Sequence, residues 1–256
     1  MKILFVGDIN GKVGRRMMAE HLLSLREDHG ADLCIVNGEN ASGGFGITEE
    51  NAEELFSAGA DVLTSGNHIW NRKETAEFLS RTPRLLRPAN YPRGAPGRGV
   101  FVEDGPAGRF AVINLMGRVF MPPLESPFQE SERLLGELDE DVRVILVDFH
   151  AEATSEKVAL GWHLDGKVSA VIGTHTHIQT ADERLLPGGT AYITDAGMTG
   201  PADSVIGIKR EIALEKFLSN RPRRMEAAAG PGQFNGVLID VDAGSGRARA
   251  IERIAF

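Results

Sequence analysis

Residues 2–10 read KILFVGDIN, an apolar run that ends directly in Gly7, Asp8 and Asn10. The same order returns at residues 32–40, DLCIVNGEN, and at residues 61–68, DVLTSGNH. Between these runs lie segments with helical spacing, at residues 14–29 and from Thr48 to Gly59, where the Thr48 hydroxyl is expected to cap the helix. Strands that alternate with helices in this way predict βα units and a largely parallel sheet.

The second half of the chain continues this pattern and adds hairpins. Two more apolar runs end in histidine, VILVDFH at residues 144–150 and VSAVIGTHTH at residues 168–177. Residues 99–102 and 109–115 are expected to pair around the turn Asp104-Gly105-Pro106, and residues 234–241 and 247–254 to form a second antiparallel pair. We therefore expect an α/β fold with two mixed sheets. No internal repeat or linker divides the chain, so residues 1–256 are expected to form a single domain.

Composition and charge narrow the class of protein. A chain of 256 residues with a formal charge of −8 disfavours long nucleic acid and anionic membranes as partners. No run approaches the ~18 apolar residues that a membrane span needs, and the first residues lack the apolar core of a signal peptide. Cys34 is the single cysteine, which excludes an intramolecular disulfide and favours the cytoplasm. Because it falls in the middle of a predicted strand, we interpret it as a buried structural thiol.

Polar and ionisable residues gather at the ends of five predicted strands. Because ligands bind outside the carboxyl ends of the strands in α/β sheets, we expect these side chains to converge. They are Asp8, Asn10, Glu39, Asn40, Asn67, His68, His150, His175 and His177. Carboxylate, amide and imidazole donors without a thiolate suit cations such as Mn, Fe, Zn or Co. The remaining histidines, His21, His29 and His163, are interpreted as structural.

Longer strings in the same segments resemble a known family. Gly7-Asp8, GNH at residues 66–68, the isolated His150 and GTHTH at residues 173–177 resemble the motifs of calcineurin-like metallophosphoesterases, in their usual order. The closer resemblance is to the YmdB-like subfamily, through NGENA at 37–41, DFHAEATSEK at 148–157 and DAGMTGP at 195–201. This resemblance implies a four-layer α/β/β/α sandwich of two mixed sheets, with a binuclear metal site at the carboxyl ends of the strands.

The resemblance also implies a ligand set, with two departures from the broad superfamily. Asn10 stands where a histidine is usual, and Glu39 stands where an aspartate usually bridges the two metals. The implied ligands are Glu39 as the bridge, Asp8, Asn40 and His177 for one metal, and Asn67, His150 and His175 for the other. Asn10 could instead take the place of Asn40. With one imidazole fewer, the first site favours Fe or Mn, with Zn, Co or Mg as alternatives.

A binuclear centre predicts hydrolysis without a covalent enzyme intermediate, through a metal-bridging hydroxide. His68 follows the implied ligand Asn67 and has no metal of its own, so it is the candidate catalytic residue, as general acid to the leaving group. Asp148 is interpreted either as a partner of His150 or as a solvated carboxylate at the strand end. Residues 43–46 are interpreted as a connector, residues 195–201 could form a rim, and candidate cationic groups for the substrate are Arg87, Arg93, Arg98 and Arg118.

The resemblance implies a metal-dependent phosphodiesterase that acts on small phosphodiesters, above all 2′,3′-cyclic nucleotides, with a role in RNA turnover or nucleotide signalling. Two metal ions, divalent or trivalent, are the expected cofactors. Two alternatives stay open: a non-catalytic metal-bound regulatory protein that acts through protein partners, and a binuclear hydrolase of another class. Assembly as a homo-oligomer is compatible with the sequence.

Overall fold

The structure is a computed structural model that describes residues 1–105 and 107–256. Pro106, the last residue of the predicted turn 104–106, lies outside the described residues. The helices are α1 (Gly11–His29), α2 (Glu49–Ser57), α3 (Thr75–Arg81), α4 (Pro127–Glu137), α5 (Thr154–Leu164) and α6 (Arg210–Ser219). At the start of α2, the Thr48 hydroxyl accepts a hydrogen bond from the Asn51 backbone N–H at 3.3 Å, so the predicted cap is confirmed.

The first sheet has five strands in the order β14-β13-β1-β3-β4. Its members are β1 (Lys2–Val6), β3 (Leu33–Asn37), β4 (Val62–Thr64), β13 (Asn235–Val241) and β14 (Ala248–Ala255). β1, β3 and β4 run parallel, whereas β13 pairs antiparallel with both β1 and β14. The carboxyl ends of the three parallel strands therefore meet at one edge, where the chain continues into Asp8, Glu39 and Asn67.

The second sheet has six strands in the order β5-β6-β7-β8-β10-β9. Its members are β5 (Val100–Gly105), β6 (Gly108–Met116), β7 (Val144–His150), β8 (Ala170–Thr174), β9 (Arg184–Leu185) and β10 (Ala191–Ile193). The predicted hairpin forms as the antiparallel pair β5–β6, and β6, β7, β8 and β10 run parallel. At the shared edge, β7 ends in His150 and β8 leads into His175.

A small third sheet, in the order β12-β11-β2, was not expected from the sequence. It consists of β2 (Asp8–Ile9), β11 (Met198–Pro201) and β12 (Gly232–Gln233). These strands are too short to show a hydrophobic period. The parallel pairing of Asp8 with Met198 nevertheless fixes the backbone of Asp8 beside the segment that leaves β10.

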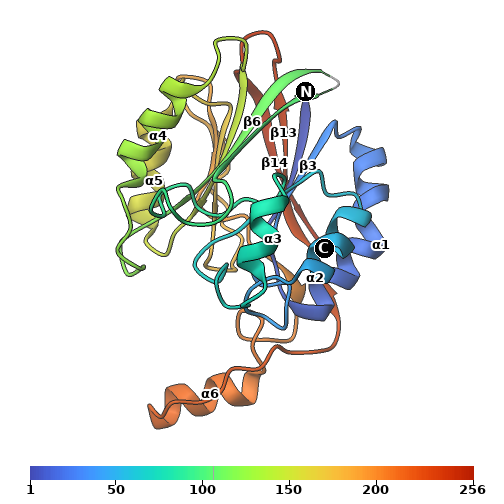
Figure 1. Cartoon of the computed structure of the whole chain (residues 1–256). Coiled ribbons are helices and arrows are strands. Elements are labelled where there is room, and N and C mark those ends of the chain that lie inside the picture. Colours follow the sequence, from blue (N-terminus) through green and yellow to red (C-terminus); the bar gives the residue numbers. More distant parts are fainter. Residues whose placement is uncertain (106) are drawn as a thin grey trace.

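Three hydrophobic clusters explain how the sheets and helices pack. Along β1, Ile3 and Phe5 point into a cluster that both large sheets share, while Leu4 and Val6 point into a cluster with α1. This alternation is the strand period of two with both faces buried. The third cluster joins the far face of the second sheet to α4 and α5. Figure 1 accordingly shows α1 and α2 on one outer side and α4 and α5 on the other, so the predicted mixed α/β class is confirmed.

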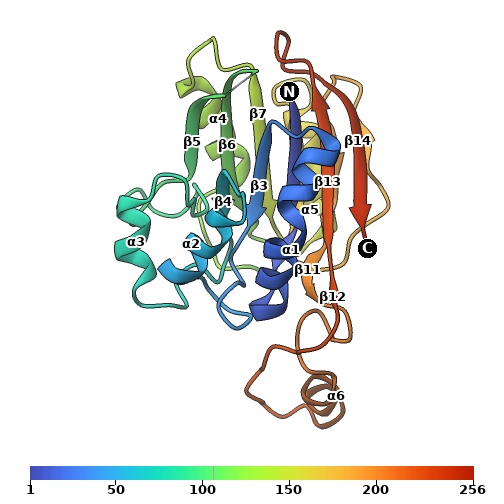
Figure 2. The same ribbon diagram turned by 90° about the vertical axis from the view of Figure 1, so that its right-hand side faces the viewer.

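One segment leaves this compact arrangement. Residues 202–231 connect β11 to β12 and carry α6, which projects from the body of the molecule in both views (Figures 1 and 2). The base of this excursion returns to the edge where the strand ends converge. Among the described residues, no helix combines the length and the apolar character that crossing a membrane would take.

Candidate metal centre

One group of donors surrounds the imidazole of His150 at the end of β7. Its Nε2 lies 3.1 Å from Glu39 Oε1, 3.0 Å from Asn67 Oδ1 and 3.0 Å from His175 Nδ1. Potential ligand atoms of Glu39, His150 and His175 all lie within 4.8 Å of one another. The structure therefore brings together Glu39 and the three residues expected to complete one metal site.

A second group lies on the other side of Glu39. Asn40 Nδ2 is 3.0 Å from Glu39 Oε1 and 3.1 Å from His177 Nε2, and His177 Nε2 is 3.8 Å from Asp8 Oδ1. His177 Nδ1 donates to the carbonyl of Ile206 at 2.8 Å, which leaves Nε2 directed at the other donors. This is the usual arrangement of a ligating histidine, in which the second ring nitrogen is held by an outer partner.

Unpartnered buried oxygens show that these residues fit a cation. Within the described part of the chain, Asp8 Oδ1, Asn10 Oδ1 and Asn40 Oδ1 are buried and have no hydrogen-bond partner. Buried polar atoms are normally paired, and unpartnered buried oxygens at these positions suit the binding of a cation. The donors are oxygen and nitrogen only, because Cys34 lies inside β3, where burial raises the pKa of its thiol to about 12.

The choice between Asn10 and Asn40 is informed by their contacts. Asn40 reaches both Glu39 and His177, whereas Asn10 stands at the N-cap position of α1 without a side-chain capping bond and lies beside Gly44 and Gly207. Both amides border the same cavity. The contacts thus connect Asn40 to the remaining donors, and Asn10 stands next to the group.

The two sheets contribute different donor chemistry. Asp8, Glu39, Asn40 and Asn67 follow strands of the first sheet and supply oxygen, while His150, His175 and His177 come from the second sheet and supply nitrogen. The centre therefore lies where the two sheets meet, and neither sheet holds it alone.

Backbone conformation at the histidine loop is unusual. His175 has a φ of 104° and His177 a φ of 67°, both in the left-handed region that L residues rarely adopt. Asp195 supports the residue between them, because its Oδ2 accepts the Thr176 N–H at 3.0 Å and forms a fully buried ion pair with Lys157 at 2.6 Å. Residues held in such conformations cluster at functional sites, where the surroundings enforce them. Asp195, the first residue of the predicted rim 195–201, is therefore buried and supports the histidine loop.

Beneath the donors, a polar cluster ties the sheets together. Asp148 accepts hydrogen bonds from Asn37 Nδ2 at 3.0 Å, from Thr64 and from Thr174 Oγ1 at 2.7 Å. Thr174 Oγ1 in turn lies 2.9 Å from His150 Nδ1. Asp148 is fully buried, so its interpretation as a solvated carboxylate is wrong, and it supports His150 through Thr174. Burial raises the pKa of Asp148 to about 6 despite these donors.

The electrostatics of the donors are strongly coupled. Burial alone would lower the pKa of His150, but the carboxylates of Glu39, Asp8 and Asp148 raise it to about 9. Burial would raise the pKa of Glu39, yet His150 and His68 bring it to about 2. Burial and the neighbouring His150 lower the pKa of His175 to about 3. The carboxylates thus favour a positive charge at this point, which a proton or a metal ion can supply.

A cavity of about 340 Å³ opens above the donors. The buried side chains of Asp8 and His150 lie beneath it, whereas Glu39, Asn40, His175 and His177 line it. Sequence patterns carry no signal for much of the remaining wall, which includes Phe45, Glu152, Ile206, Ile208 and Met225. Phe45 belongs to the stretch interpreted as a connector, and Glu152 Oε2 lies 3.1 Å from His175 Nε2.

His68 lines the same cavity, beside the donors but outside their closest contacts. Its backbone N–H donates to Glu39 Oε2 at 3.2 Å, and its ring meets Phe45 edge to face with centroids 5.0 Å apart. Asn71 Nδ2 lies 3.1 Å from His68 Nδ1 and holds the orientation of the ring. Burial lowers the pKa of His68.

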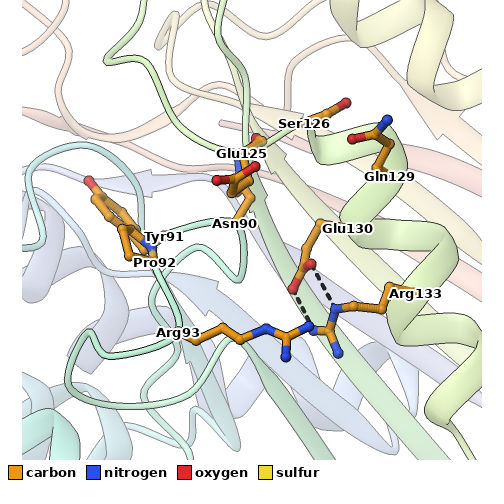
Figure 3. A pocket seen from close by; sticks show the side chains of 9 residues that line it. All are labelled: Asn90, Tyr91, Pro92, Arg93, Glu125, Ser126, Gln129, Glu130 and Arg133. Carbon is orange, nitrogen blue, oxygen red and sulfur yellow. Dashed lines mark hydrogen bonds and ion pairs between the residues drawn. The ribbon is translucent and has the colours of Figure 1, made fainter.

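The arginines proposed for substrate binding lie elsewhere. None of Arg87, Arg93, Arg98 and Arg118 is among the described residues that line the cavity. Arg87 is buried and its guanidinium donates to backbone carbonyls of Pro88 and Pro96, which holds the loop 88–99 in place. Figure 3 shows Arg93 pointing toward the Glu130–Arg133 ion pair in a separate cavity of about 430 Å³. These four candidate cationic groups are therefore not brought to the lining of the cavity above the donors.

Comparison with known proteins identifies the family of this chain and its class of enzyme. The family described as YmdB-like protein matches residues 4–254. A 2′,3′-cyclic-nucleotide 2′-phosphodiesterase of Bacillus subtilis (strain 168) is 49% identical over 254 residues, covering 99% of this chain and 96% of the relative. The predicted class of enzyme, a phosphoric diester hydrolase, is confirmed by this relative.

Two solved structures have the same fold over the whole chain. A hypothetical protein from Thermus thermophilus superposes with a TM-score of 0.95 at 41% identity and covers 100% of this chain and 99% of its own. A novel phosphatase from Mycoplasma pneumoniae also has a TM-score of 0.95, at 36% identity, with 100% and 93% covered. With a family match across nearly its full length and relatives at this identity, the chain belongs to the YmdB-like protein family.

Proposed function

We propose that this chain is a metal-dependent phosphodiesterase that hydrolyses 2′,3′-cyclic nucleotides. The observation that carries the proposal is the pair of donor groups that meet at Glu39, with unpartnered oxygens on Asp8 and Asn40 among the described residues and a cavity above them. The activity of the Bacillus subtilis relative supports the substrate class.

In this proposal Glu39 is the ligand that two metal ions share. Asp8, Asn40 and His177 would hold one ion, and Asn67, His150 and His175 the other. Fe or Mn suits the oxygen-rich first group best, with Zn, Co or Mg as alternatives. When bound, the ions supply a water of lowered pKa and positive charge for the phosphoryl oxygens. Glu152 and Ile206 orient His175 and His177 through their second ring nitrogens.

His68 is proposed as the general acid for the leaving oxygen. It lines the cavity, its backbone N–H is bound by Glu39, and its ring contacts the side chain of Asn71. In its protonated, imidazolium form, whose ordinary pKa is about 6.5, the ring can give a proton to the leaving oxygen and become neutral imidazole. Hydrolysis of the 2′ bond would then release the ribose oxygen as a hydroxyl.

The wider setting completes the proposal. We propose that residues 1–256 form one domain, a four-layer α/β/β/α sandwich, which the three hydrophobic clusters support. The single buried Cys34 supports the cytoplasm as its location. We propose a role in RNA turnover or nucleotide signalling on the basis of the substrate class. Assembly as a homo-oligomer is compatible with the proposed function.

The test combines metal analysis with turnover. The purified protein, loaded with Mn²⁺ or Fe²⁺, is expected to hold two ions per chain and to convert 2′,3′-cyclic AMP to the 3′-nucleotide. Glu39→Gln should lose both ions and turnover, whereas Glu103→Gln, an exposed residue on β5, is the matched control. His68→Ala should keep the ions and lose turnover. If neither 2′,3′-cyclic AMP nor a bis-aryl phosphate is hydrolysed in a metal-dependent reaction, the proposal is refuted.

A further inference from the structure

The cavity above the metal centre has a polar floor and an apolar wall. The polar floor includes the donor residues together with His68 and Glu152, and the apolar side chains of the wall are those of Phe45, Ile206, Ile208 and Met225. None of these four side chains carries an N–H or O–H group. Phe45 comes from the loop after β3, while the other three come from the excursion at residues 202–231. A ligand that fills this cavity would thus meet charge at one end and hydrocarbon at the other.

Ile206 occupies an unfavourable position in this wall. The backbones of Val205 and Ile208 exchange both hydrogen bonds, at 2.9 and 3.0 Å, so residues 206 and 207 form a two-residue turn. Ile206 has a φ of 47° and Gly207 a φ of 97°. Turns with positive φ at both central residues favour Asn-Gly or Gly-Gly, and a β-branched residue there is strained.

Neither packing nor the backbone contact explains an isoleucine at this point. The side chain is 47% exposed, so it does not fill a core. The hydrogen bond to His177 uses the Ile206 carbonyl, which any residue would provide. What only the side chain provides is apolar surface facing the cavity, next to Ile208 and Met225.

We infer that Ile206 is a specificity-determining residue that receives the nucleobase of the substrate, with Phe45, Ile208 and Met225 completing an apolar shelf. This inference rests on the proposed function for the phosphate end, which lies on the polar floor. Because the shelf offers no hydrogen-bonding group to a base edge, it recognises the flat face of any base and favours purines by their larger area. The strain at residue 206 is the cost of placing a hydrocarbon at the tip of the turn.

The test measures binding of the product class, so that it does not depend on turnover. Equilibrium affinities of 3′-AMP and inorganic phosphate are compared for the Mn²⁺-loaded protein and for Ile206→Asn, which suits the turn better than isoleucine and keeps the carbonyl. Loss of about 60 Å² of apolar contact predicts about a tenfold weaker affinity for 3′-AMP, or about 1.4 kcal/mol, with the phosphate affinity unchanged. The melting temperature should stay the same or rise. Ile206→Gly should behave alike.

The outcomes separate the inference from its alternatives. Leu214→Ala, an exposed apolar residue on α6 in the same excursion, is the matched control and should change neither affinity. Equal losses for both ligands would mean that Ile206 acts through His177, and unchanged 3′-AMP affinity would mean that it has no role in binding. A lower melting temperature would show a packing role. Each of these results overturns the inference, whereas normal 3′-AMP binding without hydrolysis of the cyclic nucleotide would count against the proposed function alone.

Discussion

Gly66 allows the metal donors to approach one another, and Gly66→Ala should therefore disable the centre. The residue is buried between β4 and Asn67 and does not have a positive φ, so alanine suits its backbone. A Cβ at this position would stand 2.1 Å from His150 Cδ2, 2.3 Å from His150 Nε2 and 2.4 Å from Glu39 Oε2. The added methyl group thus collides with Glu39, which both donor groups share, and with His150 of one group.

The size of the effect follows from these distances. To reach 3.0 Å, the shortest approach that real Cβ atoms show, His150 and Glu39 must retreat by about 0.6–0.9 Å. Metal–ligand distances tolerate only about 0.2 Å, so both contacts would be lost or badly strained. We expect metal affinity to fall at least as much as when an outer partner is removed, about 10- to 100-fold. Overpacking should also lower the free energy of unfolding by about 1–3 kcal/mol.

The assay is a competition titration of Mn²⁺ against a chromogenic chelator, run beside thermal unfolding and phosphodiester turnover. Gly94→Ala is a neutral control, because no heavy atom lies within 4 Å of its Cβ. Gly236→Ala is a control for destabilisation alone, since its Cβ meets the Phe5 carbonyl oxygen at 2.6 Å, away from the donors. A Gly66→Ala protein that binds Mn²⁺ with unchanged affinity would refute the reasoning, whatever its stability.

Three further predictions concern protons, charge and the thiol. Because the pKa of His150 is raised to about 9, binding of a metal ion near pH 7.5 should release about one proton, and the metal affinity should weaken about tenfold for each pH unit below 9. Calorimetry in buffers of different ionisation enthalpy measures this release, and metal binding without it would contradict the prediction. Lys157→Met should lower the free energy of unfolding, measured by urea titration, by about 3–5 kcal/mol, because Asp195 is left buried and unpaired. The double variant Lys157→Met, Asp195→Asn should recover part of the lost stability, and an unchanged urea midpoint for Lys157→Met would count against a stabilising pair. Because the Cys34 thiol is buried and its pKa is raised to about 12, it should not react with an aromatic disulfide reagent near pH 8 until the chain unfolds. Rapid labelling of the folded protein would contradict this and would show that β3 opens locally.

Much of the site could be predicted because its residues are local to strand ends. Asp8, Glu39, Asn67, His150 and His175 each lie at the carboxyl end of a strand or within three residues after it, and parallel strands place such positions at one edge. Their order along the chain also carries the family resemblance. The set of donor residues could therefore be predicted from the spacing of the apolar residues in the strands and from the identity of the residues that follow each strand.

The walls of the cavity could not be predicted in this way. Ile206, Ile208 and Met225 belong to an excursion that starts far from the other residues in sequence, and its return to the site depends on the two-stranded contacts of β11. Those strands span four and two residues, too few for a hydrophobic period.

The division of donors between the sheets has a consequence for how the protein is made. The oxygen donors have all been synthesised by residue 67, but the three imidazoles follow only at residues 150–177. A nascent chain therefore carries the oxygen donors without the imidazoles, and neither of the two proposed ligand groups is complete until the second sheet has been made. Under the proposed ligand set, metal capture waits for the second sheet, and the captured ions then act as a clasp that resists separation of the two halves.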